Sequence, residues 1–293
     1  MLQGRDERAR ALLRNLEVNR PAVLVTGGAR RIGAALARRF GAQGWHVAIH
    51  CHRSRKEAEA LAAQLPSAEV VACDLADPSA AVALVEGLAE RLEDWRALVN
   101  CASVLRPDAA SALDRAIFAE AMRVNAESPA LMAQAYLARA RSSAGRRVIQ
   151  VTDQKTANPN PDFFSYTMSK HALAATVAML DIQEGTRPDD RIYALAPGAI
   201  LPSLDQSESE AEHSHRMNLL ARRTSAQEVA EAAWWLATGP LAGGQVLFVD
   251  SGQHLVPQPR DVIYLARQQG IGQQETGQQG IGRREIGRHG EAA

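Results

Sequence analysis

The sequence predicts one doubly wound α/β domain with about seven parallel strands. Two observations favour this fold class. Short apolar, β-branched runs alternate with helical segments, and the first run leads into a glycine-containing turn that opens a helix. Because 46% of the 293 residues are hydrophobic, we expect a single core, within residues 21–257. A charged extension, 1–20, precedes this domain, and a Gly/Gln/Arg-rich tail, 258–293, which we expect to be disordered, follows it.

The first half of the domain repeats a strand followed by a helix. Helix 32–43 carries apolar residues at helical spacing, Pro78 stands in the first turn of helix 77–92, and Pro129 interrupts the helical stretch 113–141. The strands are the apolar runs between these helices. In chain order we expect strands at 22–26, 45–50, 69–73 and 97–100, and helices at 32–43, 55–64, 77–92 and within 113–141.

The second half continues this alternation. Residues 148–152 form a β-branched strand, and the prolines at 159 and 161 disfavour helix before the segment 163–180, which has helical composition and no breaker. We expect His213 and His215, in a mobile polar loop over the substrate, to face solvent. The remaining expected elements are a strand at 191–195, this loop at 199–223, a helix at 228–237 and a strand at 244–249.

The composition narrows the classes of partner. Lys+Arg and Asp+Glu balance at 33 each, so no net charge attracts nucleic acid or a membrane surface. The three cysteines form no CxxC pair, no apolar run reaches the roughly 20 residues of a membrane helix, and no signal core opens the chain. His50 and His52 lack a third ligand at a fitting spacing, so we expect no metal. We therefore expect a cytoplasmic protein with a small-molecule partner, no nucleic acid and no membrane.

The first strand, turn and helix form a phosphate-binding unit. Glycines let the backbone approach a pyrophosphate, and a helix N-terminus presents free N–H groups to it, so we expect Gly27, Arg31 and Ile32 to contact a dinucleotide. At the end of the second strand, an acidic residue would suit NAD, whereas a basic cluster suits the 2′-phosphate of NADPH. We infer NADPH, and a basic loop without a ligand is the alternative. The expected contacts of that phosphate are His52, Arg53 and Ser54.

Asp153, Tyr166 and Lys170 are the candidate catalytic residues. Asp153 follows the strand 148–152, and Tyr166 and Lys170 are four residues apart, which places both on one face of a helix. A neighbouring ammonium lowers the pKa of a phenol from about 10 toward the range that proton transfer needs. We therefore expect Tyr166 to be a general acid whose pKa Lys170 lowers; a chance pairing of Tyr and Lys is the alternative.

Taken together, these motifs resemble the short-chain dehydrogenase/reductase family from residue 21 to about residue 256. Asp153 stands where members of that family usually carry a serine. This aspartate, Arg31 in the glycine turn and the basic cluster HCHRS at 50–54 resemble the pteridine reductases and dihydromonapterin reductases. The motifs are TGGARRIG at 26–33, Asp74, NCAS at 100–103, Asn125, Tyr166xxxLys170 and Pro197-Gly198.

The resemblance implies a Rossmann fold, a homotetramer and roles for further residues. Asp74 would bind the adenine amino group, or instead cap a turn. Asn125 would stabilise a helix kink and a water that feeds Lys170, or is instead an asparagine tolerated near the proline break. Arg31 would contact a cofactor phosphate or the substrate, or instead face solvent at the start of the helix. Leu105 replaces an aromatic residue that stacks on the pterin in pteridine reductases, and Phe163 or Phe164 is a candidate to compensate. The implied cofactor contacts are Asp74, Leu75, Asn100, Ala102, Ser103, Asn125, Tyr166, Lys170, Pro197 and Gly198.

These observations predict an NADPH-dependent reductase that transfers hydride to a C=N bond of a dihydropterin. Tyr166 would deliver the proton, Lys170 would hold the nicotinamide ribose, and Asp153 would bond Tyr166 or a substrate nitrogen. A carboxylate suits a protonatable nitrogen better than a ketone oxygen, which it would repel. The alternatives are a carbonyl or 3-oxoacyl reductase of the same family and a catalytically idle nucleotide-binding scaffold. The expected substrate contacts are Arg31, Ser103, Leu105, Asp153 and Tyr166.

Overall fold

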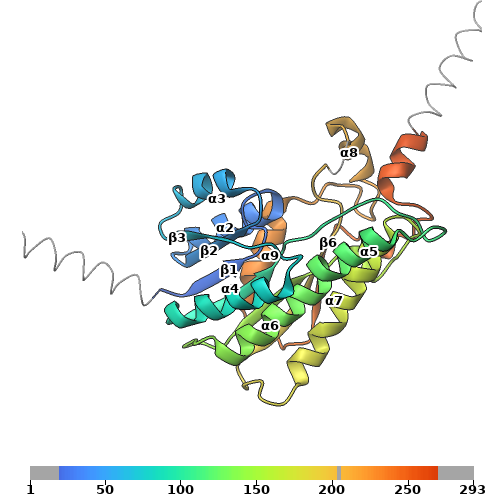
Figure 1. Cartoon of the computed structure of the whole chain (residues 1–293). Helices are drawn as coiled ribbons and strands as arrows, with labels where there is room; N and C mark the ends of the chain where they lie inside the picture. The colour runs from blue at the N-terminus through green and yellow to red at the C-terminus, as the bar shows by residue number, and fades with distance from the viewer. Residues whose placement is uncertain (1–19, 203–205, 270–293) are drawn as a thin grey trace, which may run out of the picture.

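Parallel strands form the centre of the molecule, as the sequence predicts (Figure 1). The computed structural model describes residues 20–202 and 206–269. Its sheet has seven strands in the order β3-β2-β1-β4-β5-β6-β7, and every pairing is parallel. The strands are β1 (Ala22–Val25), β2 (His46–Cys51), β3 (Ala68–Ala72), β4 (Trp95–Asn100), β5 (Arg147–Val151), β6 (Arg191–Pro197) and β7 (Val246–Val249).

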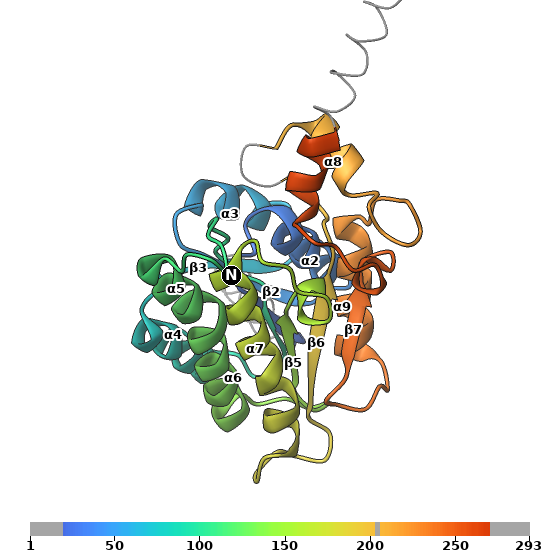
Figure 2. The ribbon, with the colours of Figure 1, turned by 90° about the vertical axis from the view of Figure 1, so that its right-hand side faces the viewer.

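Helices cover both faces of this sheet (Figure 2). α2, α3 and α9 pack on one face, and α4, α6 and α7 pack on the other. The order of the strands reverses between β1 and β4, so the crevice at their carboxyl ends lies at the switch point where ligands bind in such sheets. The helices are α2 (Arg31–Ala42), α3 (Arg55–Ala62), α4 (Pro78–Arg91), α5 (Arg115–Met122), α6 (Ser128–Arg139), α7 (Phe164–Ile182), α8 (Glu208–Ser214) and α9 (Ala226–Thr238).

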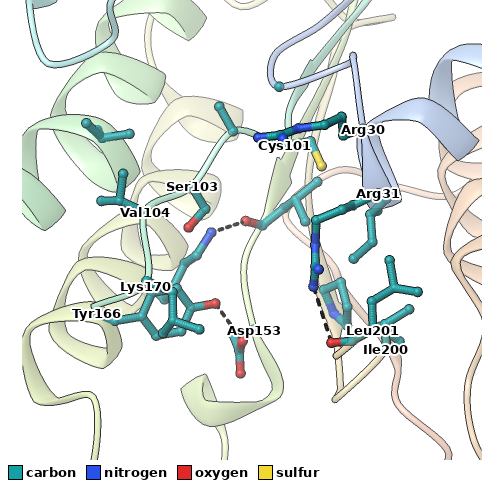
Figure 3. Close-up of a pocket in the computed structure, with 18 of the residues that line it drawn as sticks. Arg30, Arg31, Cys101, Ser103, Val104, Asp153, Tyr166, Lys170, Ile200 and Leu201 are labelled. Atoms are coloured by element: carbon teal, nitrogen blue, oxygen red, sulfur yellow. Dashed lines mark hydrogen bonds between the residues drawn. The ribbon is translucent and has the colours of Figure 1, made fainter. Parts of the chain in front are cut away.

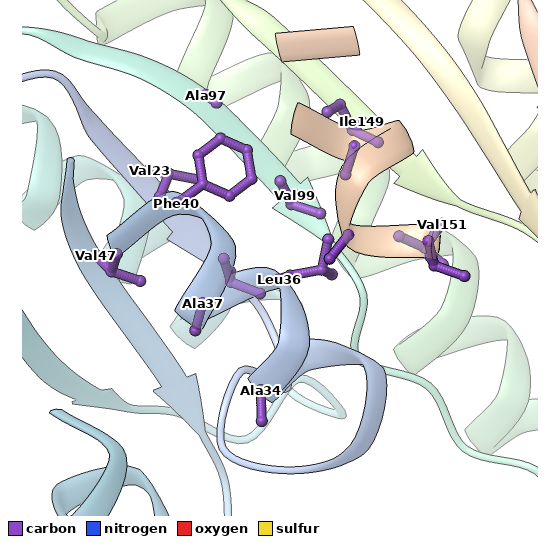
Figure 4. Packing of buried hydrophobic residues seen from close by; sticks show 14 of the residues in the cluster. Val23, Ala34, Leu36, Ala37, Phe40, Val47, Ala97, Val99, Ile149 and Val151 are labelled. Carbon is purple, nitrogen blue, oxygen red and sulfur yellow. The ribbon is translucent and has the colours of Figure 1, made fainter. Parts of the chain in front are cut away.

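Small aliphatic side chains dominate the core, and one aromatic group joins α2 to α9. Leu36, Ala37 and Phe40 of α2 are fully buried against the β-branched residues of the sheet (Figure 4). The Phe40 ring meets the rings of Trp45 and Trp234 edge-on, with centroids 5.2 and 5.5 Å away. This contact fixes α2, whose first turn borders the crevice.

The helical stretch expected at 113–141 is divided, but not at its proline. A π-helical turn, η1 (Arg123–Glu127), joins α5 to α6 without a break in the helical backbone, and Pro129 follows it in the first turn of α6. The irregular turn therefore falls on Asn125 itself. Single π turns of this kind are frequent at functional sites.

The segment expected to be a polar loop, 199–223, contains the short helix α8. Ser207 and Glu210 form a capping box at its start, which satisfies two backbone donors that would otherwise be free. Residues 203–205 lie outside the described part of the chain. A helix thus occupies part of the predicted substrate loop.

The expected boundary of the tail at 258 differs from the structure. Residues 262–269 are helical, and Val262, Ile263 and Ala266 are buried. Tyr264 also stacks on Phe163 with ring centroids 5.9 Å apart. A few apolar residues in a polar context suffice for this docking, so the folded domain extends at least to residue 269. The expected extension at 1–19 and the tail from 270 lie outside the described residues.

Within the described residues, no helix is both long enough and apolar enough to cross a membrane.

Candidate active site

A cleft of about 780 Å³ lies at the carboxyl edge of the sheet. It follows the ends of β1, β2, β4, β5 and β6, and most of the sequence-predicted site residues line it. Asn100 and Asn125 are the two that do not; both are buried behind it. Those that line it are Gly27, Arg31, Ile32, His52, Arg53, Ser54, Asp74, Leu75, Ala102, Ser103, Leu105, Asp153, Tyr166, Lys170, Pro197 and Gly198.

The glycine turn packs too closely for larger residues. Gly27 has φ +63, and a Cβ atom on it would lie 2.9 Å from the Ala102 Cα; a Cβ atom on Gly33 would lie 2.1 Å from the Gly27 carbonyl oxygen. The Gly27 N–H donates to Nδ1 of His50 at 3.1 Å, and Nε2 of His50 lies 3.1 Å from the Cys73 carbonyl oxygen. Burial lowers the pKa of His50 to about 4. This neutral imidazole therefore holds the turn to β2 and β3.

Arg31 adopts a backbone conformation that usually requires glycine. Its φ is +55, and its guanidinium donates to the carbonyl oxygens of Pro202 at 2.7 Å and Leu201 at 3.2 Å (Figure 3). The side chain thus connects the glycine turn to the segment after β6, across one end of the cleft. Arg31 lines the cleft, and its expected contact with a cofactor phosphate or the substrate stays a prediction.

The residues at the end of β2 fit a dinucleotide with a 2′-phosphate. Arg53 and His52 are exposed and line the cleft, and no carboxylate stands at the end of β2 where it would accept from a ribose hydroxyl. Asp74, after β3, accepts from the Ala76 N–H at 2.9 Å and lies 3.7 Å from His52. This carboxylate therefore caps a turn, as one of its two expected roles required, while it also lines the cleft.

Asp153 and Tyr166 form a direct pair at the other end of the cleft. The Tyr166 hydroxyl donates to Oδ2 of Asp153 at 2.7 Å (Figure 3). Oδ1 of Asp153 accepts from the Lys155 N–H at 2.9 Å. The Lys170 ammonium donates to the Val151 carbonyl oxygen at 2.8 Å and lies 5.7 Å from the centre of the Tyr166 ring. The three groups that the sequence predicted therefore share one end of the cleft.

The electrostatics of this pair differ from the expectation that Lys170 lowers the pKa of the phenol. Burial and the Asp153 carboxylate raise the pKa of Tyr166 well above its usual value. Burial also raises the pKa of Asp153, although the Lys155 N–H and the Tyr166 hydroxyl oppose this, and burial lowers the pKa of Lys170. The carboxyl group touches the phenol and the ammonium does not, so Asp153 adds to the effect of burial on the pKa of Tyr166, and the pair retains a proton.

Asn125 lies behind this cluster and holds two segments together. Its Oδ1 accepts from the Ser103 hydroxyl at 3.1 Å and the Val104 N–H at 2.8 Å, while its Nδ2 donates to the Val104 carbonyl oxygen and the Ser169 hydroxyl. The π turn brings the amide to this position. Nδ2 of Asn100 donates to the Pro129 carbonyl oxygen and to Oε1 of Gln150. Both amides thus position the cleft's walls from behind.

Several lining residues carried no recognisable signal in the sequence. His215 was expected to face solvent, but it is buried against the cleft, and burial lowers its pKa to about 4; His213 is exposed, as expected. The polar residues around His215 show no hydrophobic periodicity, so the sequence alone does not indicate that this side chain is buried. Further examples are Lys155, Ile200, Leu201, Asp261, Val262 and Ile263.

A doubly wound sheet with a glycine turn, a basic cluster after β2 and a tyrosine–lysine helix at its crevice defines a dinucleotide-dependent oxidoreductase. The model of the family described as enoyl-(acyl carrier protein) reductase matches residues 27–254. The chain belongs to the short-chain dehydrogenase/reductase family, as the sequence motifs predicted.

Three comparisons place the chain within this family. Ketoacyl reductase 2 of the granaticin polyketide synthase of Streptomyces violaceoruber is 31% identical over 80% of this chain and 97% of its own length. Pteridine reductase 1 of Leishmania tarentolae is 26% identical over 80% of this chain and 96% of its own. The crystal structure of FolM alternative dihydrofolate reductase 1 from Brucella canis, complexed with NADP, is 34% identical over 83% of this chain and 98% of that chain, with a TM-score of 0.76.

Proposed function

We propose that the protein is an NADPH-dependent reductase of a dihydropterin. One observation carries this proposal: the Tyr166 phenol is hydrogen-bonded at 2.7 Å to a half-buried carboxyl group, which stands where most members of the family place a hydroxyl. The similarity to a pteridine reductase and to an alternative dihydrofolate reductase supports the same substrate class. The basic cluster at 52–54 and the NADP in the Brucella structure support NADPH as the cofactor.

When bound, NADPH supplies a hydride to the carbon of the substrate C=N bond, and the nitrogen must gain a proton. Tyr166 holds that proton near neutral pH because its pKa is raised, and it delivers the proton when its hydroxyl turns from Asp153 to the substrate nitrogen. A substrate nitrogen that carries developing positive charge is stabilised beside this carboxyl group. The Lys155 N–H and the Lys170 ammonium then stabilise the carboxylate and phenolate as the proton leaves.

The experiment is a comparison of substrates together with one variant. NADPH oxidation is followed with dihydrobiopterin, dihydromonapterin and simple ketones, and we expect turnover of at least one dihydropterin. Tyr166→Phe should lower kcat by roughly 10²-fold or more because it removes the proton donor while leaving the ring. Thr176→Val, on the outer part of the same helix, is the matched control that removes another hydroxyl. Turnover of ketones alone contradicts the pterin assignment, and an unchanged rate in Tyr166→Phe favours an idle scaffold or another acid.

A ketoreductase is the second candidate, because the granaticin ketoacyl reductase is 31% identical to this chain. In that reaction the carbonyl oxygen becomes an alkoxide, which the Asp153 carboxylate would repel unless it is protonated. Burial raises the pKa of Asp153, so the protonated form is accessible at acidic pH. Ketone reduction would therefore be confined to low pH, whereas the proposed reduction of a C=N bond would not.

A further inference from the structure

The residues 257–269, which we name the C-terminal strap, close the substrate end of the cleft. The match to the family model ends at residue 254, so the strap lies beyond it. Figures 1 and 2 show its helix beside α8, above the carboxyl edge of the sheet, and Arg267 bonds Glu210 of α8 at 2.9 Å. Asp261, Val262 and Ile263 of the strap line the cleft.

Charged contacts fix the strap to the loop that precedes α7. Nε of Arg260 and the N–H of Asp261 both donate to Oδ2 of Asp162, at 2.7 and 2.8 Å. The Lys155 ammonium lies 2.7 Å from Oδ2 of Asp261, and it also donates to Oδ1 of Asn160 at 2.9 Å. Lys155 and Asp261 are both buried, so each charge depends on the other for compensation.

Lys155 belongs to the short 3₁₀ turn η2 (Gln154–Thr156), which connects this ion pair to the proton donor. Its backbone N–H is the group that donates to Oδ1 of Asp153, while its side chain reaches the strap. A single residue therefore contacts the carboxyl group of the reacting pair at one end and the strap's carboxylate at the other. Because Asp261 fixes the Lys155 ammonium, it also fixes η2, and η2 fixes Asp153 through the Lys155 N–H.

We propose that Asp261 is a positioning residue of the reductase site: it fixes Lys155, and through Lys155 it sets the place and the proton affinity of the Asp153–Tyr166 pair. This inference rests on the proposed function. With its two apolar neighbours in the sequence, Asp261 also forms the wall against which the substrate binds. The strap therefore forms part of the reductase site.

The charges around the Asp153–Tyr166 pair determine in which direction each substitution moves the titration of the pair. Asp153 faces Tyr166 and Lys170 of α7 and Lys155 of η2, while Tyr166 faces Asp153, Asp261 and the Cys101 thiol. Removing the Asp261 carboxylate leaves a positive charge uncompensated, which favours loss of the pair's proton. Removing the Lys155 ammonium has the opposite effect. Each change should move the titration of the pair on the order of one pH unit, in opposite directions.

The test measures kcat and kcat/KM against pH for Asp261→Asn, Lys155→Met and the double variant, with NADPH and the best dihydropterin. We expect the alkaline limb to move down by about one pH unit in Asp261→Asn, up by a similar amount in Lys155→Met, and back to the wild-type position in the double variant. The double variant carries no unpaired buried charge, so it keeps the test decisive if a single variant does not fold. The matched control is Glu86→Gln on α4, which breaks an exposed ion pair with Arg139 of α6.

The outcomes separate this inference from the proposed function. Folded variants whose profiles superimpose on that of the wild type overturn the role of Asp261. A lower rate without movement of the limb, or a double variant that is worse than both singles, shows packing alone and also overturns it. The affinity for NADPH should stay within about twofold in Asp261→Asn, because the ion pair is remote from the basic cluster that would hold the 2′-phosphate. If Tyr166→Phe retains full activity, the proposed function fails instead, whatever Asp261→Asn does.

Discussion

Replacing Asp153 by serine restores the residue that most of the family carries, and it tests the chemistry most directly. In the wild type, the Asp153 carboxyl accepts from the Tyr166 hydroxyl at 2.7 Å and from the Lys155 N–H at 2.9 Å. A hydrogen bond to a charged group contributes about 1.5–3 kcal/mol, whereas one between neutral groups contributes about 1 kcal/mol. If that bond strengthens in the transition state, its loss lowers kcat by roughly tenfold to 150-fold.

The assay for Asp153→Ser is NADPH oxidation with a dihydropterin and with a simple ketone, over a range of pH. We expect kcat with the dihydropterin to fall by that factor and the ketone to be used at least as well as before, because the repulsive carboxylate is gone. The pKa of Tyr166 should also fall, since the negative neighbour that raises it has been removed. Asp153→Asn keeps the shape without the charge and serves as the control. If Asp153→Ser retains dihydropterin turnover within about threefold, the carboxyl group has no special role, and the argument from its charge is wrong.

Two further predictions concern the cofactor and stability. Arg53→Ala should raise KM for NADPH roughly tenfold or more while leaving KM for NADH nearly unchanged, because the guanidinium would contact only the 2′-phosphate; Arg55→Ala, which breaks a surface pair with Glu59, is the control in the same steady-state assay. Asp190→Asn should lower the free energy of unfolding by about 3–5 kcal/mol, measured in urea, because it leaves the buried Arg146 guanidinium without its carboxylate. Burial opposes a low pKa for Asp190, but the Arg146 side chain and the Arg187 N–H hold it below the usual range, so the wild type should lose this stability as the pH falls through that lowered pKa, and Asp190→Asn should lose less over the same range.

The parts of the molecule that the sequence predicted are those fixed by local pattern. Alternating strands and helices follow from hydrophobic periodicity, and the pair Tyr166 and Lys170 follows from a spacing of four on one helix. Asp153 could be placed because it ends a short buried strand. In each case the signal lies within a few residues, so no knowledge of distant contacts is needed.

The parts that the sequence did not predict depend on contacts between distant segments. The strap docks through Arg260 and Asp261, which contact residues about 100 positions earlier, and its polar composition resembles that of a disordered tail. The pKa of Tyr166 depends on which neighbour actually touches it, and spacing alone favoured Lys170. In the structure the ammonium donates to the Val151 carbonyl oxygen, and burial, together with the Asp153 carboxyl group, raises the pKa of Tyr166.

Arg31 combines an unfavourable backbone conformation with contacts that join the glycine turn to the segment after β6. A residue other than glycine at φ +55 costs roughly 1–2 kcal/mol, so the position should favour glycine unless the side chain returns at least as much. Its guanidinium offsets part of this cost by donating to two carbonyl oxygens of the segment after β6. Because Arg31 is exposed, each bond contributes less than the roughly 1.5–3 kcal/mol of a shielded bond to a charged donor. The strained turn that would approach the pyrophosphate is therefore held by the same residue that holds the segment leading to α8.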